Sequence, residues 1–170
     1  MKKLLLSAIV ILGFTAVSFG QLSATANASA LVVVPLKIVK GTDLNFGVIA
    51  PSGNVGSVMV NTSNVRTSPT GSIQLIGTVA ATAAAFTVTG QGSYNYSITL
   101  PADGDVTLTT GGTSPSTMAV TGFNSNPASG TETLPTGGTQ ALSVGATIAV
   151  AATQAPGSYS ATFDVTVAYN

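Results

Sequence analysis

The stretch GSYSATFDVTVAYN, residues 157–170, ends the chain with a clear β-strand pattern. Its larger apolar side chains share one parity, whereas Ser, Thr, Asp and Asn dominate the other; the apolar set is Tyr159, Phe163, Val165, Val167 and Tyr169. A period of two predicts a strand with one buried face. Because a strand needs neighbours for its backbone N–H and C=O groups, we expect this segment to lie inside a sheet.

The other end of the chain has the features of a secretory signal peptide. Lys2 and Lys3 precede an apolar run over residues 4–19, and the small residues Ser18 and Gly20 favour cleavage before Gln21. Cleavage after Ala30 is the alternative. The run is short for a membrane helix, so we predict export to the periplasm, cell surface or medium without stable membrane insertion. The expected organisation is a signal peptide (1–20), an N-terminal strand (21–34) and one β-domain (35–170).

Residues 21–34, which we call the arm, repeat the strand pattern. Its apolar face consists of Leu22, Ala24, Ala26, Ala28, Ala30, Val32 and Val34, with polar residues between the early members. Such a strand can add to an exposed sheet edge of a partner, where main-chain hydrogen bonds give affinity and alternate side chains fill pockets. It can equally be the first strand of the chain's own sandwich, and the periodicity does not separate the two interpretations.

Composition excludes several classes of site. The chain has no cysteine and no histidine, which excludes Ser-His-Asp and Cys-His nucleophilic sites and the usual zinc sites. We therefore predict no catalytic, metal or cofactor residues and no enzyme activity. Only 6% of residues are charged and the net charge is zero, which argues against nucleic acid as a partner. A surface of Thr, Ser, Asn and Gly suits contacts between copies, or is simply that of a secreted β-protein.

The remaining sequence predicts strands separated by turns, without a helical period. Residues 94–100 and 140–152 alternate strongly, whereas residues 124–138 are rich in turn formers and are expected to be a loop. About eight to ten strands at this spacing predict an all-β, antiparallel, immunoglobulin-like or pilin-like β-sandwich. Arg66 is expected to be solvated or to pair with a surface acid.

Several motifs also carry a resemblance. The chain resembles the bacterial family called domain of unknown function 4402 in LNFG (44–47), residues 90–101, VTGF (120–123), LSVG (142–145) and the ending 157–169. More distantly, it resembles the spore coat protein U and chaperone-usher pilin group. That likeness implies an incomplete sandwich, completed by a chaperone strand and then by the N-terminal extension of the next subunit. Residues 159–169 would then flank the groove, and the arm would be the donor. The chain lacks the disulfide that many of these relatives contain.

The resulting functional hypothesis is an exported structural or adhesive cell-surface subunit, fimbrial in type, that associates by β-strand addition. Its expected partners are other copies or a periplasmic chaperone, together with a glycan or host surface. The alternative is a secreted carbohydrate-binding module that uses Asn124, Asn126, Tyr94 and Tyr96, although core packing is the simpler role for the tyrosines. Asp103 and Asp105 are interpreted as a turn, with calcium binding as the minor alternative.

Overall fold

The computed structural model describes residues 20–77 and 79–170 of the 170-residue chain, so the predicted signal peptide lies outside the described residues except for Gly20. Residues up to 31 and residues 32–170 form two separate units. In the first unit, residues 20–31 contain no helix, strand or turn, and all their side chains are exposed. The arm thus forms no strand where its sequence predicts one. The physical reason is that a strand without a hydrogen-bonded neighbour is not stable in water.

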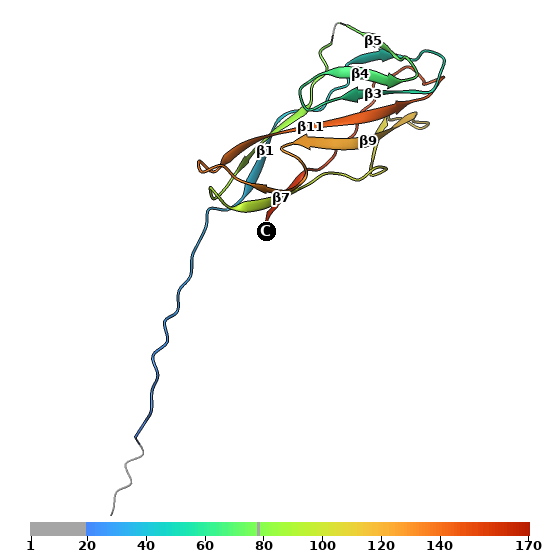
Figure 1. The fold of residues 1–170 in the computed structure, drawn as a ribbon. Coiled ribbons are helices and arrows are strands. Elements are labelled where there is room, and N and C mark those ends of the chain that lie inside the picture. Colours follow the sequence, from blue (N-terminus) through green and yellow to red (C-terminus); the bar gives the residue numbers. More distant parts are fainter. Residues whose placement is uncertain (1–19, 78) are drawn as a thin grey trace, which may run out of the picture. The chain divides into compact units, whose positions relative to one another are not determined.

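The second unit is an all-β sandwich, which confirms the predicted fold class (Figure 1). It contains twelve short strands among the described residues instead of eight to ten. None of these residues belongs to a helix that is long and apolar enough to cross a membrane. The strands are β1 (Lys37–Thr42), β2 (Val48–Ala50), β3 (Gly56–Val60), β4 (Arg66–Thr70), β5 (Gln74–Ile76), β6 (Ala84–Thr89), β7 (Asn95–Thr99), β8 (Val106–Thr109), β9 (Thr117–Asn126), β10 (Gly130–Thr133), β11 (Thr139–Val150) and β12 (Thr166–Tyr169).

β11 is the central strand of a seven-stranded sheet. Ser143 and Val144 pair with β6 on one edge and with β9 on the other, and Thr147 and Ile148 pair with β3 and β9. The sheet continues from β6 to β1, from β3 to β4 and from β9 to β8, always antiparallel. β1 is therefore a terminal strand of this sheet.

A three-stranded antiparallel sheet, ordered β10-β7-β12, packs against one end of the large sheet. One buried cluster joins β6, β7 and β11 through Val88, Tyr96, Ile98, Leu142 and Val144. A second cluster joins β3, β8, β9 and β11 farther along the domain. β2 and β5 form a separate two-stranded sheet. Alternating apolar residues on β11 contribute to both clusters, so one strand links the two halves of the core.

Two sequence-based expectations about the second half of the domain are wrong. Residues 124–138 are not simply a loop, because β9 continues to Asn126 and β10 forms within this stretch. Residues Gly130–Thr133 form a strand because β7 offers a free edge with which they pair. Conversely, only Thr166–Tyr169 of the predicted final strand has ladder partners, although Ser160 forms an isolated bridge with Thr109.

Tyr96 lies at the centre of the small sheet with none of its surface exposed. Its hydroxyl donates a hydrogen bond of 2.9 Å to Oε1 of Gln140, and Glu132 is its direct partner on β10. Burial, followed by the negative charge of Glu132, raises the pKa of Tyr96 above its usual value of 10.0. The folded state therefore favours the neutral phenol.

We expect Tyr96 to contribute to alkaline unfolding. Above pH 10 the unfolded chain ionises this tyrosine while the folded chain retains the proton, so the stabilisation that is present below pH 10 is lost as the pH rises toward the folded pKa. In urea titrations, Tyr96→Phe should lower the unfolding free energy by about 1 kcal/mol at pH 7 and reduce its fall above pH 10. Parallel pH profiles for the two proteins would contradict this assignment.

Candidate functional site

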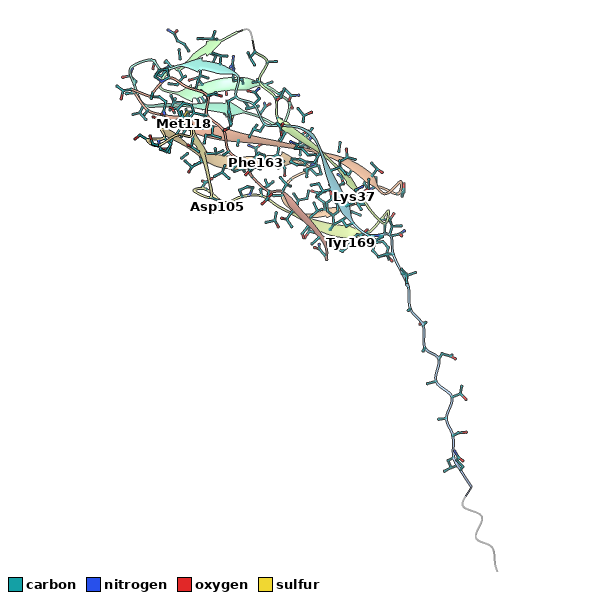
Figure 2. All side chains as sticks on the ribbon, turned by 180° about the vertical axis from the view of Figure 1, so that it is seen from behind. Lys37, Asp105, Met118, Phe163 and Tyr169 are labelled. Carbon is teal, nitrogen blue, oxygen red and sulfur yellow. The ribbon has the colours of Figure 1, made fainter. Side chains whose placement is uncertain are left out.

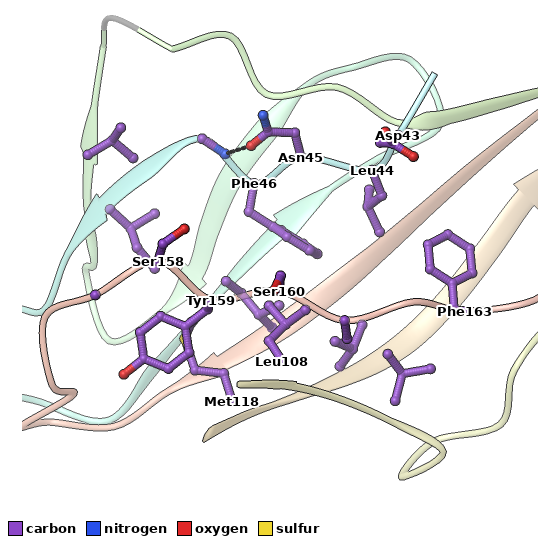
Figure 3. Close-up of a pocket in the computed structure, with 18 of the residues that line it drawn as sticks. Asp43, Leu44, Asn45, Phe46, Leu108, Met118, Ser158, Tyr159, Ser160 and Phe163 are labelled. Carbon is purple, nitrogen blue, oxygen red and sulfur yellow. Dashed lines mark hydrogen bonds between the residues drawn. The ribbon is translucent and has the colours of Figure 1, made fainter. Parts of the chain in front are cut away.

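The sandwich is open where the chain adjoins its two terminal strands, β1 and β12, which contact each other. β1 ends the large sheet and β12 ends the small one, and the chain segments adjoining them, residues 43–49 and 157–163, border a cavity of about 590 Å³ (Figure 3). A smaller cavity of about 180 Å³ continues between β1 and residues 161–163. We call the two cavities together the groove. Figure 2 shows Met118, Phe163 and Tyr169 in this order along the domain, and the first two line the larger cavity.

The groove is lined mainly by apolar side chains. Figure 3 shows Phe46 extending from one wall toward the segment that carries Tyr159 on the other. Leu44 and Phe163 are likewise half-buried, and the Phe163 ring lies 5.1 Å from that of Phe123. Buried residues of the second core cluster form the floor, namely Val106, Met118, Val120 and Ile148. The apolar surface that the groove exposes therefore belongs to the half-buried residues of its walls, which lie over a buried floor.

The backbone along both walls has a free edge. Asn45 uses its N–H and C=O for hydrogen bonds to Thr82, and Ser160 uses both of its groups for Thr109. Because successive residues of an extended chain direct their backbone groups to opposite edges, Leu44, Tyr159 and Ala161 face the groove, whereas the Phe46 carbonyl is bound by Arg66. Among the described residues, the backbone of residues 161–165 makes no hydrogen bond with the rest of the chain. Phe163 and Val165 are half-buried, whereas the other three residues of this segment are exposed to water.

Arg66 on β4 fixes one wall of the groove. Its Nη1 donates to the carbonyl oxygens of Phe46 and Val48 at 2.9 and 3.0 Å, and its Nη2 donates to Ile76 O at 3.0 Å. Gly47 has a φ of 71°, and a Cβ there would overlap the guanidinium. The expectation of a solvated or acid-paired Arg66 is therefore wrong, because the planar fork of donors instead joins the loop before β2 to β5.

Tyr169 forms a hydrogen bond with Val34, the last residue of the arm, which we call its root. Its hydroxyl donates a hydrogen bond of 2.7 Å to Val34 O and accepts one of 2.6 Å from the Gln91 N–H, while the Gln91 side chain accepts from the Val34 N–H. The Tyr94 ring packs edge-on against Tyr169, with centroids 6.2 Å apart. A Cβ at Gly90 would overlap this hydroxyl. Tyr169 and Gln91 thus hold the last residue of the arm against the domain.

The predicted groove residues occupy different positions. Tyr159 and Phe163 line the larger cavity, whereas Val167 and Tyr169 pack in the first core cluster. Of the predicted donor residues, Leu22 is 100% exposed and Val32 92% exposed. The opposite wall at Leu44 and Phe46 was missed as part of the site, although its alternating pattern marks it as a strand with an apolar face. Only the tertiary structure places it across from Tyr159.

The residues of the other hypotheses are not arranged as a site. Tyr96 is fully buried, so its ring cannot stack on a sugar. Asp105 accepts from the Ala102 N–H at 2.9 Å within a local turn, whereas Asp103 accepts from the N–H of Gly122 on β9 at 2.7 Å. No cluster of three acidic side chains that could hold a metal occurs in the part of the chain that the structure describes.

We expect Arg66→Met to destabilise the wall at residues 46–48. The variant keeps the apolar stem but leaves three carbonyl groups without a charged donor, so the unfolding free energy should fall by about 2–4 kcal/mol in urea titrations. Arg66→Lys should have an intermediate effect, because one ammonium cannot reproduce the planar fork. Lys37→Met, which removes an exposed cation from β1, is the control. Equal stability of Arg66→Met and Lys37→Met would disprove this role for Arg66.

Comparisons with known proteins give one family. The profile of the family described as Domain of unknown function (DUF4402) matches residues 36–169, which include every strand of the domain. Searches of curated proteins and of solved structures each find no match. The matched region includes both walls of the groove and Tyr169, but it ends short of the arm. On this match over most of its length, the chain belongs to the DUF4402 family.

Proposed function

We propose that this protein is an exported structural or adhesive subunit of the cell envelope that associates with other copies by β-strand addition. The groove is the acceptor, and the arm of another copy is the donor. During export, a strand from a periplasmic chaperone would occupy the same groove. The proposal assigns no catalytic step and no cofactor.

The observation that carries this proposal is the free backbone of residues 161–165 beside an apolar cavity. An added strand would supply hydrogen bonds to these residues on one side and to the edge at Leu44 on the other. It would also cover Phe46, Tyr159 and Phe163. Strand addition is a binding mode that satisfies the free edges and the apolar surface together.

The sequence of the arm is suited to this role. Its apolar face and its uncharged polar face match a site in which one side of the strand is buried and the other remains in water. No side chain between residues 21 and 34 carries a charge, so insertion does not require removing water from an ion. Each buried CH₂ group contributes about 0.8 kcal/mol. Main-chain hydrogen bonds add to this affinity.

The alternative function, a secreted carbohydrate-binding module, is less well supported. Sugars usually stack on exposed aromatic rings, whereas Tyr96 is buried and the Tyr94 ring, although 38% exposed, packs edge-on against Tyr169. Retention of monomers on a glycan column, with binding lost in Tyr94→Ala, would favour the alternative over assembly.

Ala28→Asp tests the donor role of the arm. Ala28 lies on the apolar face, so the variant would bury an unpaired carboxylate at a cost of roughly 3 kcal/mol or more. Association should weaken by more than about a hundredfold. We expect monomers in size-exclusion chromatography with light scattering, under conditions in which the wild type forms oligomers.

Asn27→Asp is the matched control, because it introduces the same charge one residue away on the polar face of the arm. This variant should assemble like the wild type. Both residues lie outside the β-domain, so neither change should alter the thermal midpoint of the monomeric domain. Wild-type oligomer yields from Ala28→Asp would show that the arm is not the donor.

A further inference from the structure

The groove changes in size along its length. Its larger cavity, about 590 Å³, lies beside residues 157–163, and its smaller cavity, about 180 Å³, lies between β1 and residues 161–163. Beyond them, toward the end of β12, Val167 and Tyr169 pack in the first core cluster. A strand that enters this groove therefore meets deep apolar space at the Tyr159 end and progressively less space toward Tyr169.

The apolar face of the arm changes in size as well. Four consecutive inward positions are alanines, from Ala24 to Ala30, and larger side chains occur only at Leu22, Val32 and Val34. Val34 is held at its own domain by Gln91 and Tyr169, and Val32 is two residues away from it. Neither valine can extend far into another molecule while these contacts persist. Leu22 is the large apolar residue of this face that is farthest from the root, and it is fully exposed.

We infer that Leu22 of a second copy occupies the larger cavity, between Phe46 and Tyr159, and that its alanines follow the narrowing groove toward Tyr169. This inference rests on the proposed function and deepens it by assigning the anchor residue and the strand direction. With Leu22 at the Tyr159 end, the arm runs parallel to residues 159–169 and antiparallel to residues 37–46. Leu22 and Ala28 are six residues apart, the same separation as Tyr159 and Val165, so the two extended segments match in length before β12 begins.

The physical reason for this direction is packing. An alanine in the larger cavity would make few contacts with the half-buried side chains of Phe46 and Tyr159, whereas leucine would contact them. In the opposite direction, Leu22 would lie at the narrow end beside Val167, and only alanines or the tethered valines would remain for the larger cavity. Apolar groups gain most where they fill space that is already shielded from water.

Substitution of the anchor is the first test. In the full chain, exported by a bacterial host and purified, Leu22→Ala should weaken association by at least tenfold in light scattering. Ser23→Ala, on the opposite face of the arm, should leave it unchanged. If Ala28→Asp prevents assembly but Leu22→Ala does not, the anchor assignment is wrong while the proposed function stands. If both variants assemble like the wild type, or if the wild type remains monomeric, both proposals fail.

Disulfide trapping tests the direction in which the arm runs along the groove. No native cysteine competes with the introduced ones, because the chain has none. We expect the pair Ser23→Cys and Ser160→Cys to give covalent oligomers under mild oxidation, since a disulfide requires Cα atoms within about 7 Å. The pair Ser23→Cys and Ala168→Cys should give few. Preferential trapping at position 168 would overturn the proposed direction. N-terminal sequencing of the exported chain must place Leu22 in it, and cleavage after Ala30 would overturn the inference.

Discussion

The requirement that backbone N–H and C=O groups find partners determines how the rest of this structure can be understood. Antiparallel ladders satisfy this requirement through most of the domain, from β1 and β6 to β9 and β8. It is not met at residues 161–165, where the extended chain continues beside an apolar groove without a neighbouring strand. The domain thus has a free edge next to half-buried apolar side chains, and in the proposed assembly a strand from another molecule would satisfy both.

The core tolerates this opening because it is divided into two clusters that share β11. The cluster around Tyr96 and Leu142 is covered by the small sheet, whereas the cluster around Met118 and Ile148 lies under the groove. With no cysteine in the chain, neither cluster is strengthened by a disulfide. Filling the groove would therefore add apolar contacts to the half of the core that is least covered, and it should stabilise the folded state by mass action.

Two polar contacts set the geometry of the groove and of the arm. Arg66 binds three carbonyl groups and holds the wall at Phe46 in place. The Tyr169 hydroxyl binds the backbone at Val34, where the arm joins the domain. Both contacts involve backbone atoms, which do not depend on the identity of the partner side chain. In the proposed assembly, the acceptor wall and the last residue of the donor arm would therefore already be held by the domain, and less conformational entropy would be lost on association.

The sequence by itself determined the all-β class, the antiparallel sandwich and the membership of Tyr159 and Phe163 in an apolar row. These properties follow from side-chain periodicity, which is local. Only the tertiary structure decided that Leu44 and Phe46 lie across the groove from Tyr159, that Arg66 binds carbonyls instead of water, and that most of the final segment lacks a ladder partner. Strand pairing joins residues far apart in the chain, so a local pattern can show that a residue needs a neighbour but not which neighbour it has.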